Sequence, residues 1–256
     1  MGIPTSLYIH IPFCATKCFY CDFNTYSFHK EQSDVYLKAL QMEMNAYASM
    51  GASLQTVFIG GGTPSILSPN SLRKMFTSLQ EHFQIEAGAE FTIECNPGTV
   101  DAEKLAIMRD CDVNRLSFGV QAMDDSILQR IGRIHSVNDI LSSYQMAREY
   151  NFDNINLDLI FALPEQTLDQ WQYSLDKVID LEPEHISAYN LTVEEGTKFY
   201  DWWNAGKLAL PNNEIEADMY QLSIEKLTQA GYFHYEISNF AKLGCEVKHH
   251  LTYWDN

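Results

Sequence analysis

The chain has 256 residues, of which 46% are hydrophobic, so it is long enough to form one large domain or a domain with part of a second. Its 34 acidic and 17 basic residues give a formal charge of −17, which argues against non-specific binding to nucleic acid or to an anionic membrane. No apolar run approaches the roughly 20 residues that cross a bilayer, and the first residues lack a signal-peptide pattern. We therefore expect a cytoplasmic location.

Short strand-like apolar runs alternate with amphipathic stretches over the first three quarters of the chain. The predicted strands cover residues 7–11, 56–59, 90–94, 115–118, 156–161 and 185–190. The predicted helices cover residues 34–50, 71–82, 102–109, 124–130, 137–150 and 168–180. Six strand-then-helix units in a row indicate an α/β fold with a parallel sheet and right-handed crossovers. The layouts to weigh are a doubly wound open sheet and a partial or full barrel.

The last quarter of the chain has a different pattern. Residues 199–203, 214–230 and 231–254 are rich in aromatic side chains and do not continue the alternation. We therefore divide the chain into a core at residues 1–195 and an aromatic-rich extension at residues 196–256. The sequence stops at YWDN (residues 253–256) without a closing helix or a polar tail, so we expect the extension to be an incomplete C-terminal domain.

Three of the six cysteines, Cys14, Cys18 and Cys21, lie within eight residues after the first predicted strand. Cysteine thiolates are the usual protein ligands of iron–sulfur clusters. Three ligands leave one iron of a cubane free to bind a small molecule, whereas a structural zinc site needs a fourth cysteine or histidine. The spacing therefore predicts a 4Fe-4S cluster. The remaining cysteines are interpreted as ordinary buried residues.

The segment HIPFCATKCFYC at residues 10–21 resembles the signature of the radical S-adenosylmethionine (SAM) family, in the branch of oxygen-independent coproporphyrinogen III oxidase. The resemblance implies a partial (β/α)6 barrel of the TIM type, in agreement with the six units. It implies that the open iron chelates the amino and carboxylate groups of SAM. It further implies that one electron from the cluster cleaves SAM to a 5′-deoxyadenosyl radical, so an electron donor is expected as a partner.

The same resemblance assigns residues to the SAM site. The run GGGTP at residues 60–64 looks like the loop that contacts the amino group of SAM, and Glu94 looks like a SAM-binding glutamate. Arg133 can pair a carboxylate through two hydrogen bonds, while Glu94 and Asp158 can accept from hydroxyl or ammonium groups. By motif match, the residues expected around SAM are Tyr8, Tyr20, Gly61, Gly62, Thr63, Glu94, Gln121, Arg133 and Asp158.

Two subfamilies of this branch compete. The oxidase removes hydrogen from propionate side chains during haem synthesis, whereas the haem chaperone HemW binds haem and passes it to target proteins. After the third cluster ligand the oxidase typically has Gly-Cys, but Asp22 and Phe23 follow here, as in HemW. The segment HHLTYW at residues 249–254 is similar to the His-Asn-x-x-Tyr-Trp motif of HemW, which is associated with haem binding, with His250 in place of Asn.

The favoured hypothesis is a HemW-like chaperone that binds SAM at a 4Fe-4S cluster, and haem or a porphyrin for delivery to a client protein. His249 and His250 are the candidates to offer imidazole to haem iron. The alternative is an oxygen-independent coproporphyrinogen III oxidase, an enzyme of porphyrin biosynthesis. A radical SAM enzyme with another substrate is a third hypothesis. The sequence thus leaves open whether the chain is an enzyme, and no catalytic residue is assigned.

Overall fold

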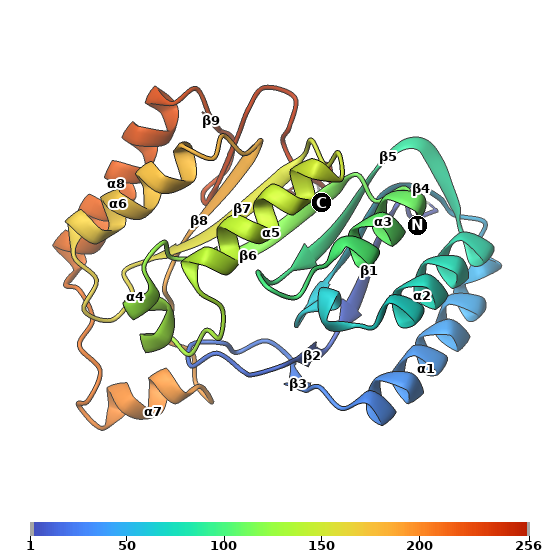
Figure 1. Cartoon of the computed structure of the whole chain (residues 1–256), viewed down its shortest axis with the longest axis horizontal. Helices are drawn as coiled ribbons and strands as arrows, with labels where there is room; N and C mark the ends of the chain where they lie inside the picture. Colours follow the sequence, from blue (N-terminus) through green and yellow to red (C-terminus); the bar gives the residue numbers. More distant parts are fainter. Residues whose placement is uncertain (1–2, 255–256) are drawn as a thin grey trace.

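The structure, a computed structural model that describes residues 3–254, is built on an eight-stranded sheet (Figure 1). Six of the strands are parallel and neighbours in chain order: β1 (Ser6–Ile11), β4 (Ser53–Gly61), β5 (Gln84–Cys95), β6 (Arg115–Gln121), β7 (Ile155–Phe161) and β8 (His185–Asn190). At least one helix connects each of these strands to the next. The prediction of an α/β fold with six consecutive β/α units is therefore confirmed.

Helices cover one face of this sheet (Figure 1). They are α1 (Lys30–Ala48), η1 (Pro64–Ile66), α2 (Pro69–His82), α3 (Ala102–Asp110), α4 (Asp125–Arg130), α5 (Val137–Glu149) and α6 (Leu168–Ile179), in chain order. Several begin at a side chain that accepts a backbone N–H, as the sequence predicts for Ser, Thr and Asp at helix starts. Ser136 and Asp139 form a reciprocal capping box at α5, and Thr167 and Gln170 do so at α6.

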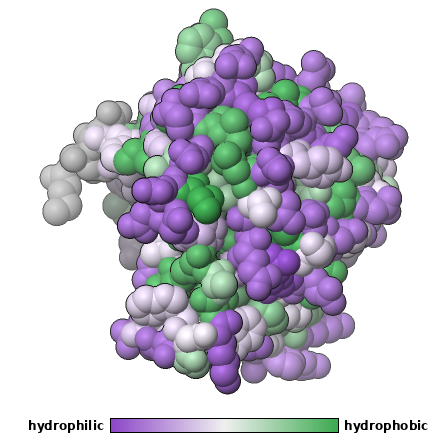
Figure 2. Space-filling view, turned by 90° about the vertical axis from the view of Figure 1, so that its left-hand side faces the viewer, coloured by the Kyte–Doolittle hydropathy of each residue, from purple (hydrophilic) through white to green (hydrophobic). Residues whose placement is uncertain are grey.

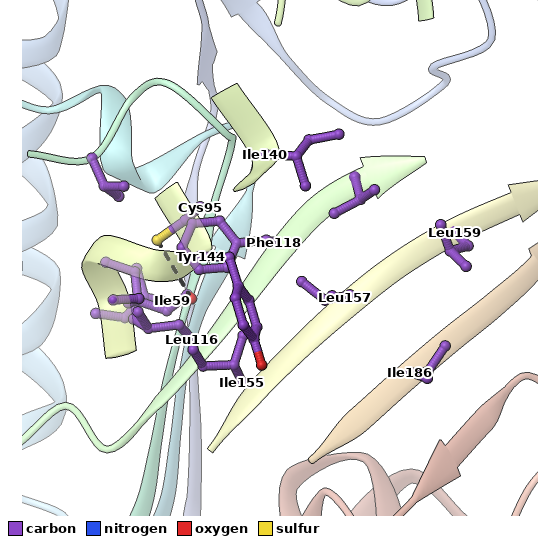
Figure 3. Close-up of a cluster of buried hydrophobic side chains, with 14 of the residues drawn as sticks. Ile59, Cys95, Leu116, Phe118, Ile140, Tyr144, Ile155, Leu157, Leu159 and Ile186 are labelled. Carbon is purple, nitrogen blue, oxygen red and sulfur yellow. Dashed lines mark hydrogen bonds between the residues drawn. The ribbon is translucent and has the colours of Figure 1, made fainter. Parts of the chain in front are cut away.

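Alternation along the strands separates an apolar face of the sheet from a polar one. Figure 3 shows the apolar face, where strand side chains pack against α5 through Ile140 and Tyr144. The strand residues of this cluster are Ile59, Cys95, Leu116, Phe118, Ile155, Leu157, Leu159 and Ile186, and each is almost completely buried. The intervening residues, including Glu94, Ser117 and Asp158, point to the opposite face. The functional groups therefore lie on the side of the sheet that helices α2, α3, α5 and α6 leave uncovered.

Three strands are clearly longer than predicted, and one of them, β6, runs to Gln121 where the prediction ended at residue 118. The segment predicted at 56–59 is the centre of β4, and the segment predicted at 90–94 is the end of β5, which begins at Gln84. Residues 84–89 include Glu86 and Gly88, so their sequence did not indicate a strand. Gln84 and Ile85 pair with Ser53 and Leu54 of β4, and the pairing resumes at Thr56 and Glu90 after a register shift, so residues 86–89 form a bulge. Tertiary pairing, and not local preference, makes this stretch a strand.

The extension adds to the same sheet. Strand β10 (Asn239–Ala241) pairs antiparallel with β8, and β9 (Phe233–His234) pairs antiparallel with β10. The helices of this region are α7 (Lys198–Asn204), α8 (Asn213–Gln229), which packs against α6, and α9 (Lys248–Trp254), which packs against β4. The division of the chain after residue 195 stays a prediction.

No helix within residues 3–254 is long and apolar enough to cross a membrane. Figure 2 shows the side of the molecule on which α6 and α8 lie, and hydrophilic side chains dominate it. Hydrophobic side chains appear there as separate spots between the hydrophilic ones, which is the usual appearance of a protein surface.

Trp171 of α6 should be important for holding α8. Its side chain is fully buried, and the indole N–H donates to Met219 O at 2.9 Å and to Ser223 Oγ at 3.1 Å. We expect Trp171→Phe to lower the free energy of unfolding by about 1–3 kcal/mol, because the hydrogen bonds are lost in a buried environment. Urea denaturation measures this loss. Tyr173→Phe, at an exposed position of the same helix, is the control, and an equal loss in both variants would contradict the prediction.

Candidate functional site

A cavity of about 380 Å³ lies between the cysteine loop and the carboxyl-terminal halves of the parallel strands. In α/β folds this is the end of the sheet where ligands bind. The structure brings together on its wall most of the residues that the sequence predicted: Cys14, Cys18, Tyr20, Cys21, Gly61, Gly62, Thr63, Glu94, Gln121, Arg133, Asp158 and His250. Tyr8 and His249 are not on this wall.

The cysteine loop is held to the rest of the fold by backbone hydrogen bonds. It leaves β2 (Phe13–Cys14) and returns through β3 (Tyr26–Ser27), which pairs with β2. In the middle of the loop, Phe19 N–H donates to Ile131 O at 3.0 Å. These hydrogen bonds fix both ends and the middle of the loop, and the three thiols face one cavity.

The thiols suit a cluster better than a single metal ion. All six cysteines are free, and burial raises the pKa of the Cys14 and Cys21 thiols. A cubane places each cysteine on a different iron, so its ligands do not need to converge on one point. Three soft thiolates on a shared cavity therefore fit an iron–sulfur cluster.

The glycine run after β4 allows the chain to pass close to the cysteine loop. Gly61 has φ of +113°, and a Cβ there would lie 2.6 Å from the ring of His10. A Cβ on Gly62 would lie 2.7 Å from the carbonyl oxygen of Phe13 and 3.0 Å from Cys14 Sγ. A side chain at residue 62 would therefore collide with the start of the cysteine loop, and one at residue 61 would collide with the ring of His10 and require a strained positive φ. The Gly61 N–H donates to Glu94 Oε2 at 2.9 Å, which joins the glycine run to β5.

Glu94 and Asp158 place two carboxyl groups on the cavity wall. Burial, together with the nearby charge of Asp158, raises the pKa of Glu94 to about 8. Burial also raises the pKa of Asp158, whose carboxyl accepts from Ser117 Oγ at 3.0 Å and from Asn156 Nδ2 at 2.7 Å. Two neighbouring buried carboxyls resist simultaneous ionisation, so a cationic ligand between them relieves the repulsion. The pair therefore suits a ligand with a positive charge.

Arg133 connects the cluster loop to the strand ends. Its Nη1 donates to Cys18 Sγ at 3.5 Å, and its Nη2 donates to Asn96 Oδ1 at 2.8 Å and to Gly119 O at 2.5 Å. Asn96 in turn donates to Thr63 Oγ1 at 2.8 Å. Gln121 lies at the end of β6, directly after a register shift, and its φ is +71°. This conformation changes the direction of the main chain where it leaves the sheet.

Sequence reasoning missed three residues that orient the site. Asn96 bridges Thr63 and Arg133, and Ser117 and Asn156 hold Asp158. The sequence signal that could have identified Asn96 as a site residue was its position two residues after Glu94, directly beyond the end of a strand. For Ser117 and Asn156 it was a polar side chain at alternate positions of an otherwise apolar buried strand, which marks the face turned away from the core.

Tyr8 lies behind the cavity wall. Its side chain is 44% exposed, its hydroxyl is 3.0 Å from His10 Nδ1, and its ring stacks on Phe58 with centroids 6.1 Å apart. Phe58 itself lines the cavity. Contact between Tyr8 and a cavity ligand stays a prediction.

The two histidines at the start of α9 lie in different surroundings. His249 is 3% exposed, with Nδ1 2.8 Å from Thr56 Oγ1, whereas His250 lines the cavity. Both rings lie against Phe58, with centroid distances of 5.3 Å and 5.6 Å. Burial and the nearby Arg115 lower the pKa of His250 to about 4, and burial lowers the pKa of His249. Both imidazoles are therefore neutral at pH 7, the form that binds metals.

Arg115 lies at the start of β6, on the polar face of the sheet. Its side chain is 1% exposed, and Nε, Nη1 and Nη2 have no hydrogen-bond partner within the part of the chain that the structure describes. The carboxylates of Glu90 and Asp158 favour its charged form, although burial lowers its pKa. This buried cation partly balances the carboxyl groups of the cavity, since it also favours ionised Glu94 and Asp158.

Comparison with known proteins finds one family and several similar chains. The profile of the Radical SAM superfamily matches residues 8–178. The Heme chaperone HemW of Bacillus subtilis (strain 168) is 47% identical over 254 residues, and the match covers 98% of this chain and 67% of that protein. The Heme chaperone HemW of Escherichia coli (strain K12) is 38% identical over 255 residues, with 98% and 66% covered. The chain thus spans about two thirds of the length of these relatives.

A solved structure is also similar over most of the chain. The coproporphyrinogen III oxidase (HemN) from Escherichia coli, described as a radical SAM enzyme, superposes with a TM-score of 0.86 at 32% sequence identity. The match covers 95% of this chain and 56% of that protein. The crystal structure of Streptococcus suis SuiB bound to S-adenosylmethionine superposes with a TM-score of 0.60 at 16% identity, which supports the fold alone.

The raised pKa of Glu94 predicts a pH-dependent stability. Between about pH 5 and pH 8 the folded chain keeps a proton on Glu94 that the unfolded chain releases. The contribution of this group to the free energy of unfolding therefore falls as pH rises through this window. Glu94→Gln stays neutral, so its stability relative to the unmodified chain should increase from pH 5 to pH 8. Urea denaturation at both pH values measures the difference, and an unchanged difference would contradict the prediction.

Proposed function

This chain belongs to the radical SAM superfamily, and we propose that it binds SAM at a 4Fe-4S cluster and handles haem as a chaperone of the HemW type. The observation that carries the proposal is the single cavity shared by three cysteine thiols, two carboxyl groups and His250. The whole-protein function is proposed from relatives of which the chain spans about two thirds.

The residues of the cavity fit the groups of SAM, which carries a sulfonium, an ammonium and a carboxylate. Cys14, Cys18 and Cys21 would hold the cluster, which supplies one electron to the bound SAM. Glu94 and Asp158 accept hydrogen bonds from ammonium and hydroxyl groups and compensate the positive charge. The glycine run brings backbone groups close to the cluster loop, since a side chain there would collide with it.

Arg133 has a double role in this proposal. Its hydrogen bonds to Asn96 and Gly119 fix the guanidinium, and its contact with Cys18 places a positive charge beside the cluster ligands. A fixed cation near thiolates favours their ionised form, which is the form that binds iron. Its remaining donors can pair the carboxylate of a ligand.

Three observations favour haem handling over oxidase chemistry. Asp22 and Phe23 follow Cys21 directly and both line the cavity. His250 lines the same cavity and His249 is its neighbour in α9, and the pKa values of both are lowered. The relatives at 47% and 38% identity are named heme chaperones. A client protein that receives haem and an electron donor for the cluster are therefore proposed partners, and the cytoplasm is the proposed location.

The second candidate is a coproporphyrinogen III oxidase acting through a 5′-deoxyadenosyl radical. The observation that favours it is the superposition on the Escherichia coli oxidase with a TM-score of 0.86. A common fold does not establish a common activity, because function depends on the residues of the site. The two candidates make opposite predictions about catalysis.

We expect the cluster to depend on the three loop cysteines. After anaerobic reconstitution the chain should contain about four iron and four sulfide ions. Cys14→Ala should lose the normal cluster spectrum in electron paramagnetic resonance, whereas Cys111→Ala, on the far side of β5 and β6, should keep it. A normal cluster in Cys14→Ala would contradict the assignment.

SAM binding should depend on the carboxyl pair. Addition of SAM should change the resonance spectrum of the reduced cluster, because the ligand reaches the open iron. Asp158→Asn should weaken SAM binding about tenfold or more, since a hydrogen bond to a charged group contributes roughly 1.5–3 kcal/mol. Asp153→Asn, which lies before β7 outside the cavity, is the matched control. Equal affinities of the two variants would contradict the role of Asp158.

Two parallel measurements distinguish the two candidate functions. The reconstituted chain is incubated anaerobically with coproporphyrinogen III, SAM and a reductant, and in parallel it is titrated with haem. We expect a Soret band of protein-bound haem and no protoporphyrinogen. Formation of protoporphyrinogen at a catalytic rate would contradict the chaperone proposal and favour the oxidase.

A further inference from the structure

We propose that Tyr235 and His185 are positioning residues of the cluster cavity, which hold the carboxyl group of Asp158 ready for a ligand through a network of hydrogen bonds. Neither of the two side chains lines that cavity. This role rests on the proposed function, in which Asp158 accepts hydrogen bonds from SAM. It also makes the SAM site depend on the aromatic-rich extension, to which Tyr235 belongs.

The network ends at the carboxyl group of Asp158. Its Oδ1 accepts from Asn156 Nδ2 at 2.7 Å, and its Oδ2 accepts from Ser117 Oγ at 3.0 Å. Asn156 Nδ2 also donates to Ser117 Oγ at 2.8 Å. An ionised carboxyl group only accepts hydrogen bonds, so the amide nitrogen of Asn156, and not the amide oxygen, faces it. The charge of Asp158 therefore fixes the orientation of this amide.

The amide oxygen of Asn156 in turn determines the state of His185. Asn156 Oδ1 lies 2.6 Å from His185 Nδ1, and an amide oxygen only accepts, so Nδ1 carries the proton. Nε2 of the same ring is then an acceptor, and it lies 2.8 Å from the hydroxyl oxygen of Tyr235. Burial and the charge of Arg115 lower the pKa of His185 well below its usual value, so the ring is neutral at pH 7, as this arrangement requires.

Tyr235 begins the network in the extension. Its hydroxyl oxygen accepts from the Val247 N–H at 3.3 Å, and its O–H donates to His185 Nε2. Every donor from Val247 to Asp158 therefore points in the same direction, toward the carboxyl group. Hydrogen bonds aligned in this way strengthen one another. The reverse direction would turn the amide oxygen of Asn156 toward the carboxylate, so it is incompatible with an ionised Asp158.

Three neighbouring strands carry the buried middle of the network. Ser117 of β6 is the register partner of Asn156 of β7, which is the register partner of His185 of β8. Each of these side chains is at most 5% exposed. The buried Arg115 lies beside them and favours both the ionised form of Asp158 and the neutral form of His185. Because water cannot replace a lost partner here, removal of the Tyr235 hydroxyl should affect Asp158.

Tyr232 offers a matched control in the same extension. Its side chain is 4% exposed, and its hydroxyl donates to Pro183 O at 2.7 Å, just before β8. Tyr232→Phe and Tyr235→Phe thus each remove one hydroxyl that links the extension to the region of β8. Only the hydroxyl of Tyr235 belongs to the network that ends at Asp158.

The SAM affinity of the anaerobically reconstituted chain, measured by isothermal titration calorimetry, tests this role. We expect Tyr235→Phe to weaken SAM binding about threefold or more, the usual effect of losing one buried hydrogen bond. Tyr232→Phe should keep the affinity of the unmodified chain. In an Asp158→Asn background Tyr235→Phe should have a clearly smaller effect, because the charge toward which the network points is absent.

The outcomes distinguish the positioning role from the proposed function. If the unmodified chain binds no SAM, the proposed function fails and the positioning role fails with it. If the chain binds SAM but Tyr235→Phe has the same affinity as Tyr232→Phe, the positioning role alone is wrong. Equal fold-changes of Tyr235→Phe with and without the Asp158 charge also overturn it, since the hydroxyl would then act independently of this carboxyl group. Thermal unfolding, monitored by circular dichroism, should show both tyrosine variants folded at the temperature of the titration.

Discussion

The two-sided parallel sheet is the constraint on which the rest of this structure depends. Because side chains alternate along each strand, the residues that build the apolar core also determine where the polar residues point. Leu116 and Phe118 enter the core beneath α5, so Ser117 between them must face the other side. The same holds for Leu157 and Leu159 with Asp158. The site is a consequence of the packing that stabilises the fold.

The polar face of the sheet carries charged side chains that are largely buried from water. Glu94 and Asp158 lie on the same cavity, and Arg115 lies on the same polar face with no hydrogen-bond partner among the described residues. A buried charge is costly unless it is paired, so Arg115 without a hydrogen-bond partner in the described chain and two carboxyl groups that repel each other suit a surface that a polar ligand completes. The cysteine loop closes this surface from the other side and is kept close by the glycines at residues 60–62.

Much of the site could be predicted from sequence because its signals are local. Three cysteines in eight residues, a run of three glycines and a glutamate at a strand end are each recognisable in one segment. Asn96 was not found, because its role arises from contacts with Thr63 and Arg133, which lie 33 and 37 residues away in the chain. The position of Tyr8 behind Phe58 likewise depends on the pairing of β1 with β4. The start of β5 at Gln84 and Ile85 also depends on pairing with Ser53 and Leu54 of β4.

By itself, the sequence determined the six β/α units and the family, and it predicted the cluster ligands, because hydrophobic period, residue type and short spacing are properties of single segments. It also placed two histidines side by side at residues 249 and 250. Only the tertiary structure distinguished them, since it turned His249 onto Thr56 and Glu90 and His250 toward the cavity. Side chains of adjacent helix residues point about 100° apart. The packing of α9 on the sheet therefore decides which of the two histidines faces β4 and which faces the cavity.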